Sequence, residues 1–284
     1  MKKLLLLCCV VALLSLSSLA GTVTTLYANN ATGGVPYIYQ IDATTGVVLN
    51  TYTNLQGVNG RGVVDVNNIL YYTTAYDGLG NVWKYDLSTQ TQLGVAFHVA
   101  GATALASITY DGTNFWIGDY SGTNKAFEYS PSGTLLNTIT LGNCTGYCDG
   151  LTYFKQGGVG YLLSNRVDGC CGGTPVAYDV YDLNGNLVHA NLISEPNLST
   201  GVAWDGTDFW TSNIFNGAIS EWDMNGNFIG TQTLTGYPNG FTPLIEGMSF
   251  NFAQTVGTPE PGTLIMFGSG LLGLAGVVRR KFML

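Results

Sequence analysis

Two nearly identical segments, SITYDGTNFW at residues 107–116 and VAWDGTDFW at residues 202–210, decide the fold. Each is typical of a strand, a tight turn and a second strand rich in aromatic residues. Asp-Gly predicts the turn, because a two-residue hairpin loop needs the positive φ that Gly adopts without strain. Weaker copies begin at Gly62, Gly150 and Gly247. The five copies therefore start near residues 62, 107, 150, 201 and 247, in steps of 43 to 51 residues.

A second hairpin motif follows each copy of the first. Its five occurrences are YQIDATTG at 39–46, KYDLST at 84–89, EYSPSG at 128–133, VYDLNG at 180–185 and EWDMNG at 221–226. Two hairpins in each repeat of about 46 residues give four strands, which is the spacing of a β-propeller blade. The sequence thus predicts an all-β propeller of five four-stranded blades. A six-bladed ring, an open sandwich and a β-solenoid are the alternatives.

The two ends of the repeat region predict how the ring closes. The last copy, from Gly247 to Asn251, supplies only a first strand, and residues 25–53 supply three more. We expect these N- and C-terminal segments to complete one blade together, because a closed ring removes exposed sheet edges. By its repeat pattern alone, this body at residues 21–257 resembles the broad group of NHL-like and lactonase-like propellers.

Composition agrees with an all-β body and limits its partners. The chain has 39 Gly and only 10% charged residues, which argues against a helical bundle. Between residues 21 and 258 there are 5 basic and 17 acidic residues, a net charge of −12. Non-specific nucleic-acid binding needs a basic surface, so we expect no nucleic-acid partner.

The first 20 residues predict a secretory signal peptide. Lys2 and Lys3 precede an apolar stretch that runs from Leu4 to Leu14, and Ser18 and Ala20 are small residues suited to a cleavage site. A buried N-terminal helix is the alternative. A signal peptide predicts export through the Sec machinery.

The last 27 residues, 258–284, carry a three-part pattern. Pro259-Glu260-Pro261-Gly262 precedes an apolar run that ends at Val278, and Arg279-Arg280-Lys281 follows it. This order resembles the PEP-CTERM sorting signal of exported proteins in Gram-negative bacteria that make extracellular polysaccharide. The resemblance implies an exosortase as partner, with Pro259, Glu260, Pro261, Gly262, Arg279 and Arg280 as sorting residues. It also implies a C-terminal transmembrane helix that holds the protein in the inner membrane at least transiently; a plain membrane anchor is the alternative.

Four cysteines remain after signal cleavage, and disulfides are the expected state outside the cytoplasm. Cys144 and Cys148 lie in the loop that enters the fourth repeat, and Cys170 and Cys171 lie in a later loop of the same repeat. We expect bonds between the two pairs, because a bond between neighbours in sequence is strained. A four-thiolate zinc site is the alternative, but adjacent Cys170 and Cys171 suit tetrahedral ligation poorly.

The catalytic potential of the sequence is small. His98 and His189 fall in outer strands of different blades, so a shared metal or a Ser-His-Asp arrangement is not expected. Polar residues near the mouth of the central channel form one possible hub site. Its candidate members are Asp149, Glu246, Arg61, Asn213, Asp119 and Arg166. Two of these carboxylates could cleave a glycoside if they converge, or could hold Ca²⁺.

These features predict an exported cell-surface or matrix protein associated with exopolysaccharide or biofilm. We expect its propeller to bind polysaccharide or surface proteins, or to serve a structural role. We expect no catalysis and no required cofactor. An extracellular hydrolase or lactonase with a hub carboxylate site, with or without calcium, is the alternative.

Overall fold

The computed structural model describes residues 24–31, 37–75, 78–102, 104–142, 144, 148, 150–166, 176–195, 199–214, 216–237 and 244–250. The expected signal helix, the C-terminal transmembrane helix and the PEP-CTERM segment lie outside these residues, as do Asp149, Cys170 and Cys171. Within the described residues, no helix has the length and apolar character needed to span a membrane.

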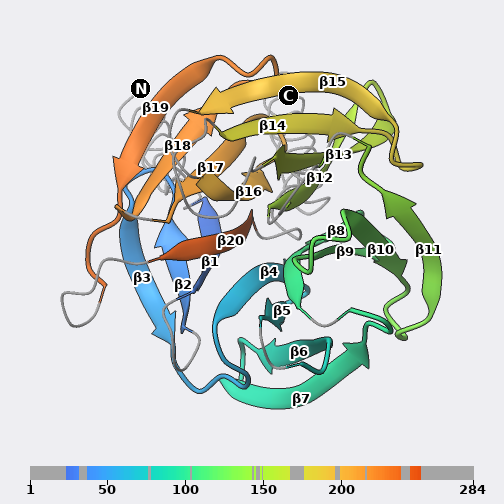
Figure 1. Cartoon of the computed structure of the whole chain (residues 1–284). Helices are drawn as coiled ribbons and strands as arrows, with labels where there is room; N and C mark the ends of the chain where they lie inside the picture. The colour runs from blue at the N-terminus through green and yellow to red at the C-terminus, as the bar shows by residue number, and fades with distance from the viewer. Residues whose placement is uncertain are drawn as a thin grey trace, which may run out of the picture. The chain divides into compact units, whose positions relative to one another are not determined.

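Twenty strands form five separate four-stranded antiparallel sheets arranged as a ring, which confirms the predicted five-bladed propeller (Figure 1). Blade I has the order β20-β1-β2-β3, and blades II to V are β4–β7, β8–β11, β12–β15 and β16–β19. In blade I, β1 is Thr25–Asn30, β2 is Tyr37–Asp42, β3 is Val47–Tyr52 and β20 is Ile245–Phe250. In blade II, β4 is Gly60–Val66, β5 is Ile69–Thr74, β6 is Asn81–Asp86 and β7 is Thr91–His98.

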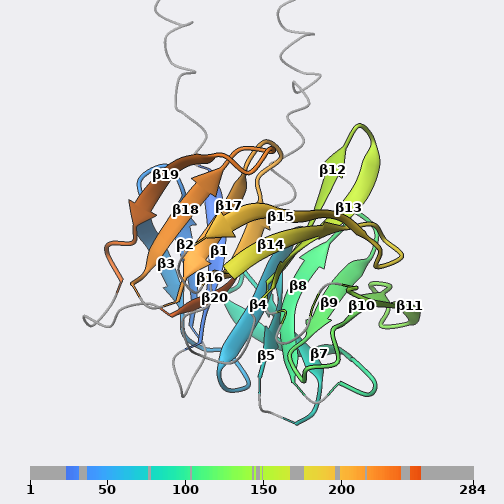
Figure 2. The ribbon, with the colours of Figure 1, turned by 45° about the horizontal axis from the view of Figure 1, so that its top comes forward.

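Blades III, IV and V follow the same plan. In blade III, β8 is Leu105–Tyr110, β9 is Phe115–Asp119, β10 is Lys125–Tyr129 and β11 is Leu135–Thr140. In blade IV, β12 is Leu151–Gln156, β13 is Val159–Arg166, β14 is Val176–Tyr181 and β15 is Leu187–Glu195. In blade V, β16 is Ser199–Trp204, β17 is Phe209–Asn213, β18 is Ala218–Trp222 and β19 is Phe228–Thr233. The first strand of each blade lies nearest the centre of the ring and the fourth lies at the rim (Figures 1 and 2).

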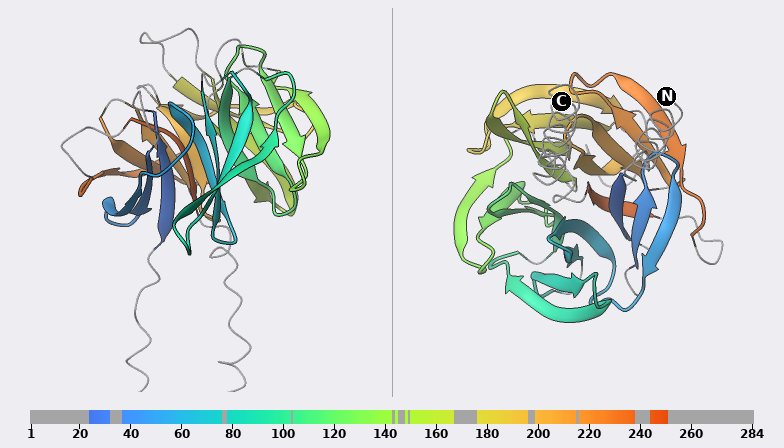
Figure 3. Two further views of the ribbon diagram at one scale, coloured as in Figure 1. Left: turned by 90° about the horizontal axis from the view of Figure 1, so that it is seen from below. Right: turned by 180° about the vertical axis from the view of Figure 1, so that it is seen from behind.

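Strands from both ends of the body complete blade I. β20 pairs antiparallel with β1, with Leu26 opposite Phe250 and Asn29 opposite Gly247. The view from behind shows the same ring, and the view from below shows it edge-on (Figure 3). The expected closure by N- and C-terminal strands is therefore confirmed.

Glycines on the innermost strands let the blades approach closely at the hub. A Cβ added at Gly150 would lie 1.9 Å from the carbonyl oxygen of Thr200 on the next blade. A Cβ at Gly247 would lie 2.3 Å from the carbonyl oxygen of Arg61. Glycine at positions 150 and 247 is thus required by the close approach of the neighbouring innermost strand.

Buried hydroxyl groups on the second strands link neighbouring blades. Ser212 of β17 accepts a hydrogen bond from the backbone N–H of Gly201 in its own blade at 3.0 Å and donates to the carbonyl oxygen of Ile245 in blade I at 2.9 Å. Thr73 of β5 bridges β4 and β8 in the same way. These bonds satisfy backbone groups that burial at the hub removes from water.

Aromatic and aliphatic side chains fill the spaces between blades. One cluster lies between blades IV and V; its buried members are Phe154, Leu163, Tyr178, Val180, Ile193, Val202, Phe209 and Trp222. Similar clusters lie at other blade boundaries. The propeller therefore has several small cores rather than one.

Candidate functional site

Two of the predicted hub residues meet in a buried ion pair. Arg61 is the second residue of β4 and Glu246 is the second residue of β20, so they hold equivalent positions in blades II and I. Arg61 Nη1 lies 2.9 Å from Glu246 Oε2, with side-chain exposures of 7% and 10%. The Arg61 guanidinium also lies 4.5 Å from the centre of the Tyr120 ring, close enough for a cation–π contact. This pair joins blade II to β20, the strand that closes blade I.

The other predicted hub residues have local roles where they are described. The Asp119 carboxylate accepts hydrogen bonds from the backbone N–H of Ser121 at 2.9 Å, from the Ser121 hydroxyl at 2.6 Å and from the Thr123 hydroxyl. Asn213 ends β17, opposite Ser199. Asp119 therefore shapes its own loop, and convergence of Asp149 with Glu246 stays a prediction because Asp149 lies outside the described residues.

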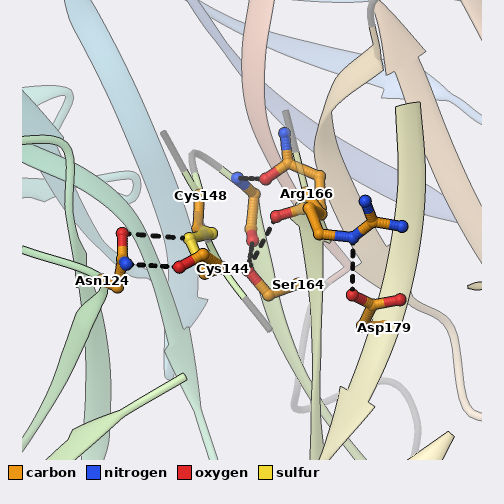
Figure 4. Close-up of a disulfide and its surroundings, with 8 residues drawn as sticks. Asn124, Cys144, Cys148, Ser164, Arg166 and Asp179 are labelled. Atoms are coloured by element: carbon orange, nitrogen blue, oxygen red, sulfur yellow. Dashed lines mark hydrogen bonds and ion pairs between the residues drawn. A yellow bond between two sulfur atoms is a disulfide. The ribbon is translucent and has the colours of Figure 1, made fainter. Parts of the chain in front are cut away.

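The structure contains a disulfide between Cys144 and Cys148. Their Cα atoms are 6.3 Å apart, within the usual 4.4–6.8 Å range for disulfides. Both cysteines are 4% exposed in the cluster between blades III and IV, and Asn124 Nδ2 donates to the Cys144 carbonyl oxygen (Figure 4). The expected cross-loop bonds to Cys170 and Cys171 are wrong for this pair, because Cys144 and Cys148 are bonded to each other.

A second ion pair, missed as such by the sequence analysis, lies in blade IV. Arg166 at the end of β13 donates from Nε to Asp179 Oδ2 at 3.1 Å, and Asp179 is fully buried (Figure 4). Asp179 Oδ1 accepts from the backbone N–H of Asn191 at 2.7 Å, and Arg166 Nη2 donates to Asn191 Oδ1 at 2.6 Å. Arg166 therefore holds the β14–β15 pair in place, rather than serving the hub together with Arg61.

A pocket of about 370 Å³ opens at the boundary of blades IV and V. The described residues that line it are Phe154, Gln156, Tyr161, Val180, Val188, His189, Leu192, Met224 and Asn225. The sequence placed His189 correctly in an outer strand but gave no sign of this pocket, because its walls come from separate strands and from two blades.

Equivalent turns of blades III and V differ at one residue. In blade III, Asp111 Oδ1 accepts from two backbone N–H groups and its Oδ2 accepts from Trp116 Nε1 at 3.1 Å. Asn114 Nδ2 then donates to Glu128 Oε1 at 2.8 Å. These bonds confirm the predicted turn role of the repeated Asp, and the Asn–Glu bond connects the turn to β10.

In blade V an aspartate replaces this asparagine. Asp205 repeats the bonds of Asp111, including one from Trp210 Nε1 at 3.0 Å. Asp208 cannot donate when ionised, and one oxygen each of Asp205, Asp208 and Glu221 lies within 4.8 Å of the others. Burial and then the neighbouring carboxylates raise the pKa of Asp208 and the pKa of Glu221. Three carboxylates fall short of the six to eight oxygen ligands of Ca²⁺, so the cluster alone defines no metal site.

We expect Asp208→Asn to stabilise the protein at pH 7 by about 1 kcal/mol, because it removes a like charge and restores the hydrogen bond to Glu221. Urea unfolding of wild type and variant measures this difference. Asn114→Asp in blade III is the matched reverse change and should destabilise by a similar amount. Equal stability of all three proteins would contradict the expectation.

Asp65 is a buried carboxylate outside the candidate hub site. It lies fully buried on β4, near Tyr27 and Tyr52, and burial raises its pKa to about 6. Its folded-state pKa therefore lies above the ordinary value of 3.8. Ionised Asp65 destabilises the fold above pH 6, and this cost disappears as the pH falls from 6 towards 4.

Asp65→Asn should accordingly raise the free energy of unfolding at pH 7.5 by roughly 2–3 kcal/mol, at 1.36 kcal/mol for each pKa unit. Near pH 4 the gain should vanish, because Asp65 is then protonated in the folded wild type. Thermal unfolding of both proteins between pH 4 and pH 8 measures the difference. A gain independent of pH would rule out ionisation as its cause.

Comparison with known proteins identifies the C-terminal segment and supports the fold. Residues 258–281 match the PEP-CTERM protein-sorting motif, which marks the chain as an exported protein sorted by exosortase. The body of this protein is the β-propeller described above. None of the curated proteins matches the chain.

Solved structures resemble the propeller at low sequence identity. A chain of the crystal structure of a nidogen/laminin complex is 10% identical, with a TM-score of 0.56, and the match covers 81% of this chain and 99% of that one. The glutaminyl cyclase of Myxococcus xanthus is 15% identical, with a TM-score of 0.50, over 67% of this chain and 80% of that one. At these identities the likeness concerns the fold alone.

Proposed function

We propose that the protein is delivered to the cell surface or the extracellular matrix, where its propeller binds polysaccharide or surface proteins without catalysis, or serves as a structural component. The observation that carries this proposal is the PEP-CTERM match at residues 258–281, which follow the propeller in the sequence. We further propose that residues 1–20 are removed as a signal peptide and that residues 258–284 hold the protein in the inner membrane until exosortase acts.

The contacts at the hub favour binding or structure over hydrolysis. A hydrolytic pair needs one carboxyl group as acid and another as base or nucleophile. The Glu246 carboxylate faces Arg61 in a buried pair, and Asp119 is occupied by its own loop. These described hub carboxylates thus have structural partners, which supports a non-catalytic role.

Fractionation of cells with and without exosortase tests the sorting step. We expect mature protein outside the cell, with a shortened C-terminus by mass spectrometry, only when exosortase is present. Glu260→Ala should leave the full tail in the membrane fraction, whereas Thr263→Ala, a neighbour outside the Pro-Glu-Pro sequence, should be processed normally. An uncut tail and unchanged location in both strains would overturn the sorting proposal.

Association with the matrix needs a separate experiment. In cells unable to make exopolysaccharide, we expect the processed protein to leave the cell surface and appear in the medium. Retention at the surface to the same extent as in polysaccharide-producing cells would contradict polysaccharide binding while leaving the sorting step intact.

A further inference from the structure

The pocket between blades IV and V is built from two layers of different chemistry. Phe154 lies at its base, only 3% exposed, with its ring centre 5.6 Å from that of Tyr161. Gln156, His189 and Asn225 are exposed and supply amide and imidazole groups. The pocket therefore offers an aromatic and aliphatic surface together with a few polar groups, the usual composition of a small-molecule site.

A bulge in β15 forms one wall of the pocket. Val180 lies opposite His189, whereas Tyr178 lies opposite Ile193, so β15 has two more residues than β14 over this interval. Among the described strand pairs, no other register shift adds as many residues. His189, the paired residue before the bulge, and Leu192, within it, both line the pocket. Bulges often redirect side chains next to functional sites.

Polar contacts with Asp179 and Arg166 hold this bulge in one conformation. Asn191, within the bulge, has a φ of 55°, in the left-handed region. Its backbone N–H donates to buried Asp179, and its side-chain oxygen accepts from Arg166. The conformational cost of a non-glycine residue at positive φ is therefore offset by three linked groups, and the pocket wall is preorganised.

The opposite wall comes from the β18–β19 turn of blade V. A Cβ at Gly226 would lie 1.8 Å from the carbonyl oxygen of Leu192, so this turn packs directly against the bulged strand. At the corresponding turns, Leu87 and Leu183 pack against the hydrophobic clusters of their boundaries. Met224 holds the equivalent position in blade V but lines open space. At this blade boundary a pocket therefore occupies the place where the other two boundaries have a packed leucine side chain.

The described lining residues include no Lys, Arg, Asp or Glu. An anionic ligand would gain no counter-charge there and would meet a body with a net charge of −12. A pyranose ring has a C–H face that can stack on an aromatic ring, and hydroxyl groups that can bond to amides and imidazole. The volume also lies within the 300–1,000 Å³ of typical ligand pockets.

We propose that this pocket binds one neutral sugar unit of a polysaccharide, with Tyr161 against its apolar face, Phe154 packed against the Tyr161 ring, and Gln156, His189 and Asn225 at its hydroxyl groups. This assignment rests on the proposed non-catalytic binding function and gives it a site and a ligand class.

Titration of the exported, processed protein tests the assignment. The probes are the methyl glycosides of glucose, galactose, mannose and N-acetylglucosamine, with glucuronic acid as the anionic counterpart. Calorimetry and saturation-transfer NMR measure their binding. We expect at least one neutral glycoside to bind and glucuronic acid not to bind. His189→Ala and Gln156→Ala should each weaken binding about five- to tenfold, the effect of losing one hydrogen bond of about 1–1.5 kcal/mol.

Two further variants separate binding from folding. His98→Ala removes the other exposed histidine, on β7 of blade II, and should leave the dissociation constant unchanged. Met224→Trp should fill the pocket and abolish binding while the circular dichroism spectrum stays that of the wild type. The assignment is overturned if no neutral glycoside binds at millimolar concentration, or if the His189 and Gln156 variants bind as wild type. Either result leaves the exosortase and matrix experiments unaffected, so failure of the pocket and failure of the proposed function remain distinct.

Discussion

Glu246→Ala should lower the free energy of unfolding by about 3–5 kcal/mol, because it leaves the Arg61 guanidinium buried without its carboxylate partner. This is a large part of the roughly 5–15 kcal/mol that stabilises a typical protein. The pair joins β4 of blade II to β20, so the loss weakens the contact that the closing strand makes with the next blade. Urea unfolding followed by tryptophan fluorescence measures the change.

A double variant separates the electrostatic cost of removing the Glu246 carboxylate from the cost of lost packing. Arg61→Leu with Glu246→Leu removes both charges and should be considerably more stable than Glu246→Ala, since apolar pairs often replace buried ion pairs at little cost. If Glu246→Ala costs less than about 1 kcal/mol, the pair behaves as an exposed surface pair and does not secure closure.

Gly150→Ala should destabilise the propeller by about 3 kcal/mol, the upper part of the range for overpacking a core. The new methyl group would lie 1.9 Å from the Thr200 carbonyl oxygen, and backbone of the next blade must move to accept it. Thermal unfolding should show a midpoint lower by several degrees, and the two innermost strands involved, β12 and β16, should lose protection from hydrogen exchange.

Gly230→Ala is the matched control. Gly230 lies on β19 at the rim, and a Cβ there meets nothing within 4 Å. This variant should be neutral or slightly more stable, because alanine restricts the unfolded chain more than glycine does. Equal losses at Gly150 and Gly230 would show that strand propensity, rather than close approach at the hub, causes the effect.

The repeat made the architecture predictable. Asp-Gly and Asn-Gly turns recur at a fixed step, and each turn has a physical requirement for its residues, so the number of blades and the closure of blade I followed from spacing alone. The role of Asp111 and Asp205 as turn residues followed for the same reason, and both accept the expected backbone hydrogen bonds.

Features that depend on neighbours in space could not be predicted in this way. The partner of Cys144 could not be predicted, because the cysteines lie outside the repeated motifs and four cysteines allow three pairings. The β15 bulge adds residues to one strand without disturbing the alternating pattern around it, and Asp179, which holds that bulge, looks in sequence like any polar residue of a strand. The pocket depends on that bulge and on the turn of the next blade, so neither segment alone reveals it.

Closure by β20 has a consequence for the order of events during export. Leu26 pairs with Phe250, so the ring cannot be completed until nearly the whole body has emerged on the far side of the membrane. Pro259 follows the closing strand by only nine positions in sequence. If the C-terminal segment holds the chain in the membrane, as proposed, this slow, long-range pairing of the last strand with the first has time to finish before release.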